Sequence, residues 1–215
     1  MTDPAHGESS SAFEDTRTII TDPPFYTQEF EDSYQYIIDV YEVTPKDIAI
    51  FIPCALRKPY STSPSHRIIR SVIDQVLSPS EYHIIIFGTC GVVPSELETM
   101  YPYAHYQYML GKVTDENIKT DFVRIETERI AGYLDKTRNT YKRRIGYCIG
   151  LFRESLIRGS EKSGVPIDSI LPTKDMINKV MELDCPFQEG SLSMDEYLEE
   201  FYEGLIAIKN SLNCM

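Results

Sequence analysis

Two short apolar runs with a helix-length segment between them constrain the fold more than any other feature. Residues 47–53 read DIAIFIP and residues 82–87 read YHIIIF. Isoleucine-rich runs of this length, bounded by polar residues or glycine, are typical of strands that are buried on both faces. Ser65 is a candidate helix cap between them. Apolar residues then follow at helical spacing: Ile68, Ile69, Val72, Ile73 and Val76. The pattern predicts a βαβ unit, with parallel strands joined by a right-handed crossover.

The rest of the chain extends this unit into an α/β domain. Residues 145–149, which read IGYCI, are predicted to form a third strand. Spacing and length predict further helices at 28–41, 95–100, 114–136, 152–162, 174–183 and 194–212. Helices that alternate with buried strands in this way indicate a layered α/β fold with a small, mostly parallel sheet.

The length of 215 residues fits one domain with tails. We expect residues 1–20 to form a disordered acidic leader, because small and polar residues cannot bury enough apolar surface to become ordered. Residues 21–215 then form a single α/β domain. Its last part, over about 174–212, is expected to be an acidic helical segment.

The formal net charge of −12 argues at first against a nucleic-acid partner. The acidic residues, however, gather near the two ends: residues 1–34 and residues 181–208 each hold eight of them. The middle of the chain is therefore mildly basic. Its densest basic run consists of Lys136, Arg138, Lys142, Arg143 and Arg144. We expect this basic run to bind RNA phosphate, with a solvated turn between helix and strand as the alternative.

Several protein classes are disfavoured by composition. No apolar run approaches the ~18 residues of a membrane span. The first twenty residues lack the basic start and apolar core of a secretory signal. The five cysteines are odd in number, widely spaced and without a CxxC pair, which argues against a disulfide scaffold or zinc finger. We expect a cytoplasmic protein that does not contact membranes.

The loop after the first strand carries an unusual set of side chains. In an open parallel sheet, ligands bind beyond the carboxyl ends of the strands. Here Cys54 ends the strand, Arg57 and Lys58 follow within four residues, and Tyr60 and His66 come next. A thiol beside cations or at a helix N-terminus favours its thiolate form and becomes a nucleophile. The alternative for Cys54 is a small, inert core residue.

The loop after the second strand is the second candidate region. Glycines at 88 and 91 allow backbone to come close to a ligand. Glu96 and Glu98 offer carboxylates that can hold an amine or accept a proton. Aromatic residues follow at positions 101, 103, 106 and 108, and they either stack on a flat heterocycle or fill the core.

Two gap-free motifs in these loops match one family. Pro-Cys, three residues, Lys-Pro-Tyr, two residues, Ser, two residues and His correspond to Pro53-Cys54, Lys58-Pro59-Tyr60, Ser63 and His66. Val-Pro-x-Glu-Leu-Glu and Tyr-Pro-x-Ala-His-Tyr correspond to Val93 to Glu98 and Tyr101 to Tyr106. Over about residues 45–165 the chain resembles the catalytic core domain of archaeosine synthase. It departs from the family at Thr89-Cys90-Gly91, where the family pattern predicts Ser-Pro-Leu-Gly.

The resemblance implies a substrate and a fold. The family acts on 7-cyano-7-deazaguanine already present in the D-loop of archaeal tRNA, and adds the side-chain amine of lysine to the nitrile. A radical SAM partner then cleaves the adduct to leave archaeosine. The implied fold is a three-layer α/β/α arrangement similar to uracil-DNA glycosylases, with no cofactor of its own. The full enzyme also has transglycosylase-like and PUA-type regions, so we expect a stand-alone or split member that works with an RNA-binding subunit.

The chemistry assigns roles to the motif residues. A thiolate adds to a nitrile to give a thioimidate, from which an amine displaces the thiol. The expected catalytic residues are Cys54 as nucleophile, His66 and His105 for proton transfer near neutral pH, Lys58 beside the thiolate, and Glu96 holding the incoming lysine. The expected substrate-binding residues are Arg57, Tyr60, Ser63, Gly91, Glu98, Tyr101 and Tyr106, with a tyrosine stacking on the base.

Three alternatives stay open. Cys54, His66, Cys90 and His105 are candidate zinc ligands, although their spacing matches no standard pattern, and we expect no metal. A glycosylase follows from fold analogy alone. A non-catalytic binding module is the strongest rival, in which the last helix docks a partner that binds RNA. The residues of that helix face are Tyr197, Leu198, Phe201, Tyr202, Leu205 and Ile206.

Overall fold

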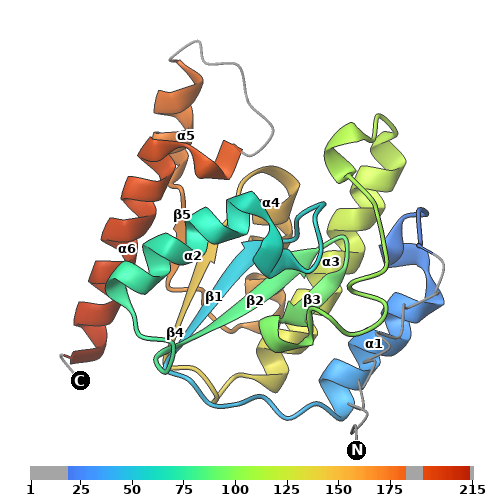
Figure 1. Ribbon diagram of the computed structural model, residues 1–215, viewed down its shortest axis with the longest axis horizontal. Helices are drawn as coiled ribbons and strands as arrows, with labels where there is room; N and C mark the ends of the chain where they lie inside the picture. Colours follow the sequence, from blue (N-terminus) through green and yellow to red (C-terminus); the bar gives the residue numbers. More distant parts are fainter. Residues whose placement is uncertain (1–18, 183–190, 214–215) are drawn as a thin grey trace, which may run out of the picture.

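The computed structural model describes residues 19–182 and 191–213 (Figure 1). Most of the expected leader therefore lies outside the described residues, as do Cys185 and Cys214. The described ranges contain no helix of the length and apolar character needed to cross a membrane.

A five-stranded sheet forms the centre of the molecule (Figure 1). Its strands are β1 (Ile48–Pro53), β2 (Tyr82–Gly88), β3 (Gly91–Pro94), β4 (Arg143–Tyr147) and β5 (Ser169–Leu171). Their order is β3-β2-β1-β4-β5. β1 pairs in parallel with β2 and β4, β4 pairs in parallel with β5, and only β3 is antiparallel to its neighbour. The predicted α/β class and mostly parallel sheet are confirmed.

Three strands differ from the prediction. β3 and β5 were not expected, because they have four and three residues and too short a pattern to show a period. β4 begins two residues before the predicted 145–149, since Ile48 of β1 pairs with Arg143. The charged side chains at this start hid a strand whose backbone already belongs to the ladder. After Tyr147 the chain leaves the sheet.

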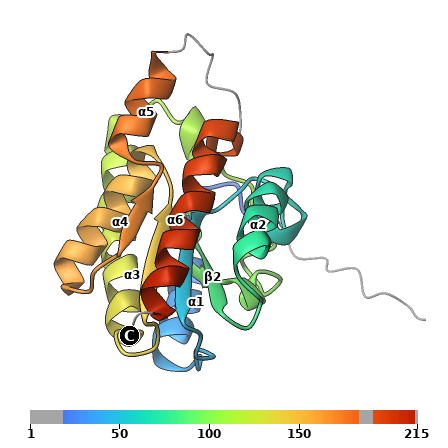
Figure 2. The same ribbon diagram turned by 90° about the vertical axis from the view of Figure 1, so that its left-hand side faces the viewer.

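Within residues 19–182 and 191–213, six α-helices pack around the sheet (Figures 1 and 2). They are α1 (Gln28–Asp39), α2 (Pro64–Val76), α3 (Glu116–Lys136), α4 (Gly150–Ser163), α5 (Lys174–Met181) and α6 (Asp195–Asn213). α2 begins with Ser63 at its N-cap position, not Ser65. The expected helix at 95–100 is only a 3₁₀ turn, Ser95–Leu97.

Helices lie on both faces of the sheet (Figure 2). α3 and α4 cover one face, and α2 and α6 cover the other. Contacts at β4 show the alternation: a Cβ on Gly146 would lie 2.4 Å from Leu156 of α4, whereas Ile145 lies near Gly204 of α6. Because successive residues of a strand point to opposite faces, β4 contacts both helix layers. α6 therefore packs on its own domain, where Phe201 stacks on Tyr147 at 4.2 Å between ring centroids.

The two ends of the sheet each carry a polar region. We call the end at which β1 and β2 finish, at Pro53 and Gly88, the carboxyl edge. The end at which they start, at Ile48 and Tyr82, is the amino edge. The core between them is apolar and fully buried, with every residue from Ile48 to Ile52 at 0% exposure. The sheet thus acts as a rigid spacer between two polar regions.

Candidate active site

Cys54 lies at the carboxyl edge, directly after β1. Its backbone N–H donates to the carbonyl of Phe87 on β2 at 2.8 Å, which continues the ladder by one residue. Its side chain is half-buried, and its Sγ lies 3.4 Å from Oγ1 of Thr89. The thiol is therefore held between the end of β1 and the turn after β2, as the first motif predicts.

The turn from β2 to β3 shapes the space around the thiol. Gly88 and Gly91 pair across it, and both have positive φ, +133° and +77°. Glycine is the residue that adopts such angles without steric cost. A Cβ on Gly88 would lie 2.6 Å from Cε1 of Phe152 and 3.0 Å from Sγ of Cys54. Glycine at this position thus lets the Phe152 ring and the Cys54 thiol pack directly against the turn, which a side chain would prevent.

The two cysteines of the site hold their protons unequally. A hydrogen bond from the Cys90 side chain is the largest cause that lowers the pKa of Cys54, and burial opposes it. With the further effects of Thr89 and of the positive charge of Lys58, the pKa falls from 9.0 to about 5. Burial raises the pKa of Cys90 well above its usual value, and the neighbouring Cys54 adds to this. At neutral pH, Cys54 is a thiolate and Cys90 is a thiol.

Lys58 links the two sequence motifs. Its Nζ lies 3.5 Å from the ring centroid of Tyr106 and donates to the carbonyl of Leu56 at 3.1 Å. Burial lowers the pKa of Lys58, while the cysteines Cys54 and Cys90 oppose that shift. The ammonium therefore sits on an aromatic face and adds positive charge near the thiolate. Arg57, its neighbour in sequence, is exposed.

The predicted stacking tyrosines are buried. The hydroxyls of Tyr60 and Tyr106 are 2.8 Å apart, and neither ring is more than 1% exposed. Tyr60 also stacks on His66 with ring centroids 5.7 Å apart. These two rings join the motifs inside the core and offer no open face. Tyr101, which packs against His105 at 5.6 Å between centroids, is half-buried and lies nearer the surface.

His66 supports the end of β1 and does not titrate near neutral pH as expected. It is 2% exposed, and its Nε2 lies 2.9 Å from the carbonyl of Pro53. Burial lowers the pKa of His66 to about 4, because a charged imidazolium loses its hydration there. The neutral ring donates from Nε2, while Nδ1 has no hydrogen-bond partner within the described part of the chain. Ser63, buried at the N-cap position, lies 3.0 Å from Ser65 between hydroxyl oxygens.

The side chains of the two predicted glutamates, which are separated by one residue, bind different partners. Glu98 accepts a hydrogen bond from the backbone N–H of Ser61 at 2.9 Å, so it ties the second motif to the first. Glu96 accepts from Tyr41 and from Nε2 of His83, the latter at 2.8 Å. Although burial opposes it, these bonds lower the pKa of Glu96 to about 2.

The structure does not bring Glu96 to Cys54. β3 runs antiparallel to β2, from Gly91 at the carboxyl edge back toward the amino edge, and Glu96 follows its end. At about 3.3 Å per strand residue, the amino-edge position of His83 is roughly 16 Å from Gly88. A role for Glu96 at the thiol is therefore incompatible with this placement.

Two charged residues of α3 enter the site without having been predicted. Glu126 is 0% exposed, and its Oε1 accepts the backbone N–H of Gly88 at 2.9 Å. Arg129 is 3% exposed, and its Nη2 donates to Glu31 of α1 at 3.1 Å. The sequence contains a signal for Glu126, because it falls four residues from both Phe122 and Ile130 on the apolar stripe. A charged residue in that register is a buried one.

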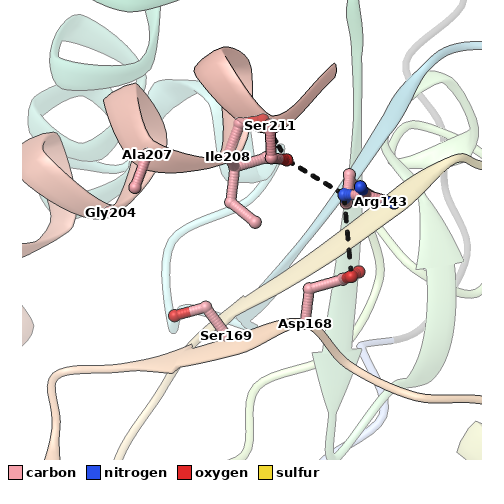
Figure 3. Close-up of a pocket in the computed structure, with 7 residues that line it drawn as sticks. All are labelled: Arg143, Asp168, Ser169, Gly204, Ala207, Ile208 and Ser211. Carbon is pink, nitrogen blue, oxygen red and sulfur yellow. Dashed lines mark hydrogen bonds and ion pairs between the residues drawn. The ribbon is translucent and has the colours of Figure 1, made fainter. Parts of the chain in front are cut away.

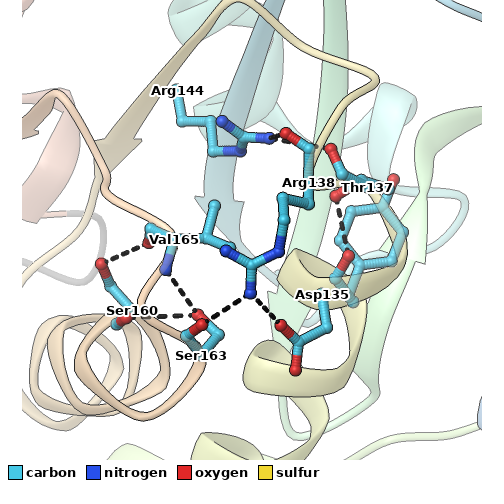
Figure 4. Close-up of polar contacts among 8 residues, drawn as sticks. Asp135, Thr137, Arg138, Arg144, Ser160, Ser163 and Val165 are labelled. Carbon is cyan, nitrogen blue, oxygen red and sulfur yellow. Dashed lines mark hydrogen bonds and ion pairs between the residues drawn. The ribbon is translucent and has the colours of Figure 1, made fainter.

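The basic run lies at the amino edge and is largely engaged within the protein (Figure 4). Arg138 donates to Asp135 at 2.6 Å and to the carbonyl of Ser163 at 2.8 Å. Arg144 is 5% exposed and donates from Nη2 to the carbonyls of Thr137 and Arg138 at 2.8 and 3.0 Å. These contacts tie the end of α3 to β4.

The other members of the run show the same pattern. Lys136 donates to the carbonyl of Ile38 at 2.7 Å, and Lys142 pairs with Asp47 at 2.8 Å. Arg143 contacts Ser211 at 3.0 Å in an open cavity of about 500 Å³ beside α6 (Figure 3). The cavity is lined by Arg143, Asp168, Ser169, Gly204, Ala207, Ile208 and Ser211. The whole run lies at the other end of the sheet from Cys54.

The zinc alternative has no support in the structure. Among residues 19–182 and 191–213, no group of three or more His, Cys, Asp or Glu side chains is arranged to hold a metal ion. Cys54 and Cys90 share a hydrogen bond in place of a common ligand. His66 turns its Nε2 toward the backbone carbonyl of Pro53.

Comparisons with known proteins match the region that holds this site. Residues 30–168, more than half of the chain, match the family described as "Domain of unknown function (DUF5591)". The chain is 33% identical over 128 residues to archaeosine synthase subunit alpha of Methanosarcina acetivorans, covering 56% of this chain and 18% of that protein. It is 35% identical over 71 residues to the subunit alpha of Thermoplasma acidophilum, covering 33% and 14%.

A third curated relative and a solved structure agree with these matches. Archaeosine synthase of Haloferax volcanii is 34% identical over 98 residues, covering 46% of this chain and 15% of that protein. This chain spans less than a fifth of the length of each curated relative. The crystal structure of AF0587, a protein of unknown function, is similar in fold with a TM-score of 0.52 at 20% identity. That match covers 80% of this chain and 48% of the other.

Proposed function

The chain belongs to the family described as DUF5591, and on this premise we propose that it is an archaeosine synthase-like transferase that modifies tRNA. The names of its curated relatives support the tRNA pathway. The resemblance of its two motifs to the archaeosine synthase core supplies the substrate, 7-cyano-7-deazaguanine in tRNA, and lysine as the amine donor. The proposal includes a uracil-DNA-glycosylase-like fold, a cytoplasmic location, an RNA-binding subunit and a radical SAM partner.

The observation that carries the proposal is the placement of Cys54 at the carboxyl edge, where its Sγ lies 3.4 Å from Oγ1 of Thr89 and close to the charge of Lys58. A nitrile is a weak electrophile, and splitting its reaction with an amine into two steps lowers the barrier. In the first step Cys54 Sγ forms a bond to the nitrile carbon, and the nitrogen takes up a proton to give a thioimidate. In the second step the lysine amine attacks the same carbon, gives up a proton, and the carbon–sulfur bond breaks. The product is an amidine-type adduct and Cys54 returns as a thiolate.

The surroundings of Cys54 fit this chemistry. The Cys90 thiol and the Lys58 ammonium favour the thiolate, so the nucleophile is ready at neutral pH. Glycine at position 88 lets the ring of Phe152 and the thiol of Cys54 both pack closely against the turn, which fixes the position of Sγ. Tyr60, Tyr106 and Glu98 join the loops and hold this geometry, which is their proposed role in place of stacking.

The test is a transfer assay with purified protein, tRNA bearing 7-cyano-7-deazaguanine, and isotopically labelled lysine. The nucleosides are digested and weighed by mass spectrometry. We expect a lysine adduct with the wild type and none with Cys54→Ala. The matched control is Cys148→Ala, because Cys148 is a buried thiol after β4 whose pKa burial raises to about 12.

Two outcomes would contradict the proposal. Near-normal adduct formation by Cys54→Ser or Cys54→Ala would rule out the covalent route. No adduct from the wild type, even with a matching cell extract added, would favour a binding module without catalytic activity.

A further inference from the structure

Glu126 is a buried carboxyl group with one satisfied oxygen. Its Oε1 accepts the N–H of Gly88 at 2.9 Å, whereas its Oε2 has no hydrogen-bond partner among the residues that the structure describes. The side chain is 0% exposed. A buried polar atom without a partner is uncommon in folded proteins and asks for a functional explanation. Nothing in the transfer steps above uses this group.

Gly88 places Glu126 beside the nucleophile. Its N–H contacts Oε1 of Glu126, and a Cβ on the same residue would lie 3.0 Å from Sγ of Cys54. The carboxyl and the thiolate thus border one residue that has no side chain between them. Phe152 closes the same space, since the Gly88 Cβ would lie 2.6 Å from its ring. The Gly88 turn therefore brings the buried carboxyl of Glu126 and the nucleophile to the two sides of a single residue.

The groups around Glu126 and Cys54 determine which of the two side chains holds a proton. Burial raises the pKa of Glu126 well above its usual value, Arg129 and the Gly88 N–H oppose this, and Cys54 reinforces it. Arg129 also forms an ion pair with Glu31 of α1, in which Nη2 lies 3.1 Å from Oε2. The groups that face the pair from other elements are the Cys90 thiol on the turn and Lys58 on the first loop.

We propose that Glu126 is the acid of the Cys54 centre, an inference that rests on the proposed function. As Cys54 Sγ bonds to the nitrile carbon, the protonated carboxyl of Glu126 gives its proton to the nitrile nitrogen and becomes a carboxylate. When the lysine amine attacks the thioimidate carbon, the carboxylate takes a proton from that amine. The carbon–sulfur bond breaks, and both Cys54 and Glu126 return to their starting states.

The decisive variant is Glu126→Gln, which keeps the shape and an acceptor for Gly88 but has no proton to donate. We expect lysine transfer to fall about 100-fold or more, the usual contribution of a positioned acid. The midpoint of Cys54 alkylation by iodoacetamide against pH should stay within about half a unit of the wild type, because one neutral group replaces another. Glu128→Gln is the matched control, since Glu128 lies on the same helix but pairs at the surface with Lys162 at 2.6 Å.

A measurement on the wild type covers the case in which Glu126→Gln does not fold. Infrared spectroscopy at neutral pH should show the carbonyl band of a protonated carboxylic acid, and Glu128→Gln should retain it. Absence of that band would overturn the inference, as would full transfer by Glu126→Gln or an alkylation midpoint lowered by one unit or more. A wild type that forms no lysine adduct overturns the proposed function instead, and the infrared and alkylation results then decide the state of Glu126 by themselves.

Discussion

The two edges of the sheet hold similar side chains with different hydrogen bonding. At the amino edge, His83 uses both ring nitrogens, with Nδ1 2.6 Å from the Tyr141 hydroxyl and Nε2 2.8 Å from Glu96. At the carboxyl edge, His66 uses Nε2 alone and leaves Nδ1 without a partner in the described ranges. Each edge also has a pair of buried tyrosines joined through their hydroxyls, at 3.0 and 2.8 Å.

The difference shows that residue type alone does not indicate function. A histidine and a glutamate that bond to each other stabilise the fold, as His83 and Glu96 do. Similar residues with unsatisfied atoms around a thiolate are poised for chemistry, as Glu126 and Arg129 are. We therefore assign stability to the amino edge and reaction to the carboxyl edge. The following predictions test that division.

The largest effect is expected from Gly88→Ala, which should disable the carboxyl edge. The new methyl group meets Phe152 and Cys54 at 2.6 and 3.0 Å, and alanine rarely adopts a φ of +133°. Strain of this kind costs roughly 1–3 kcal/mol of unfolding free energy. Displacement of the thiol should reduce lysine transfer by about 100-fold. Denaturant unfolding and the transfer assay measure the two effects.

Gly111→Ala is the control, because its Cβ meets nothing within 4 Å and its φ is not positive. If Gly88→Ala and Gly111→Ala transfer lysine equally well, the close packing of Gly88 against Cys54 is not needed for transfer, which would contradict the account.

At the amino edge, His83→Ala should cost stability without changing thiol chemistry. It removes one buried and one partly buried hydrogen bond, which Tyr141 and Glu96 then lack. We expect the free energy of unfolding to fall by roughly 2 kcal/mol. The rate of Cys54 alkylation at neutral pH should stay within about twofold of the wild type. A drop of more than about tenfold in that rate would show that the two edges are coupled.

The pH dependence of Cys54 should separate it from Cys148. With a pKa of about 5, Cys54 is a thiolate throughout the neutral range, and its alkylation should slow only as the pH falls toward 5. Cys148, with its pKa raised by burial to about 12, should remain unreactive until the protein unfolds. Alkylation followed by peptide mass spectrometry resolves the two sites. A midpoint near 8 or 9 for Cys54 would remove the distinction between this thiol and Cys148.

The pKa shifts of Cys54 and His66 also make the free energy of unfolding depend on pH. Between pH 5 and 9 the unfolded Cys54 binds more protons than the folded one, so its contribution to stability rises with pH across this window and is lost as the pH falls through about 5. His66, whose pKa falls from 6.5 to about 4, acts in the same direction between those values. Glu126, whose pKa burial raises, acts in the opposite direction over this window, so the test compares variants. Between pH 5 and 6.5 the unfolding free energy of His66→Phe should rise less, or fall more, than that of the wild type.

The smallest effects concern RNA affinity. Arg57 is exposed beside the site, whereas Lys142 of the basic run pairs with Asp47 at the amino edge. We expect Arg57→Ala to weaken tRNA binding and to lower the slope of log affinity against log salt by about 1. Lys142→Ala should change both affinity and stability little, because exposed ion pairs contribute less than about 1 kcal/mol. The reverse result would restore the basic run as the RNA contact.

The sequence predicts the helices and strands that have clear apolar spacing, and it misses those that are too short to show any. β1, β2 and α2 follow from apolar spacing, and the thiol at the end of β1 follows from the parallel sheet. β3 has only four residues, and without it Glu96 was expected on the wrong edge. That expectation was wrong because an antiparallel return carries the chain back along the sheet. Tertiary pairing, which no local pattern shows, determined the position of Glu96.

Burial accounts for the other differences. His66 was expected to titrate near neutrality because the usual pKa of histidine lies there, yet this side chain is buried against Pro53. Glu126 was overlooked as one more charged residue on a helix, although its spacing from Phe122 and Ile130 placed it on the apolar face. A charged residue in the apolar register of a helix therefore predicts a buried group, and burial changes the pKa of such groups most.

The most direct test of the account is to trap the bond between Cys54 and the nitrile. The protein is incubated with tRNA bearing 7-cyano-7-deazaguanine in the absence of lysine, and covalent protein–RNA complex is measured by denaturing gel and mass spectrometry. The account predicts a complex with wild type and with Cys148→Ala, none with Cys54→Ala, and release as the lysine adduct once lysine is added. A wild type that forms no complex, or a complex that persists in Cys54→Ala, would contradict it.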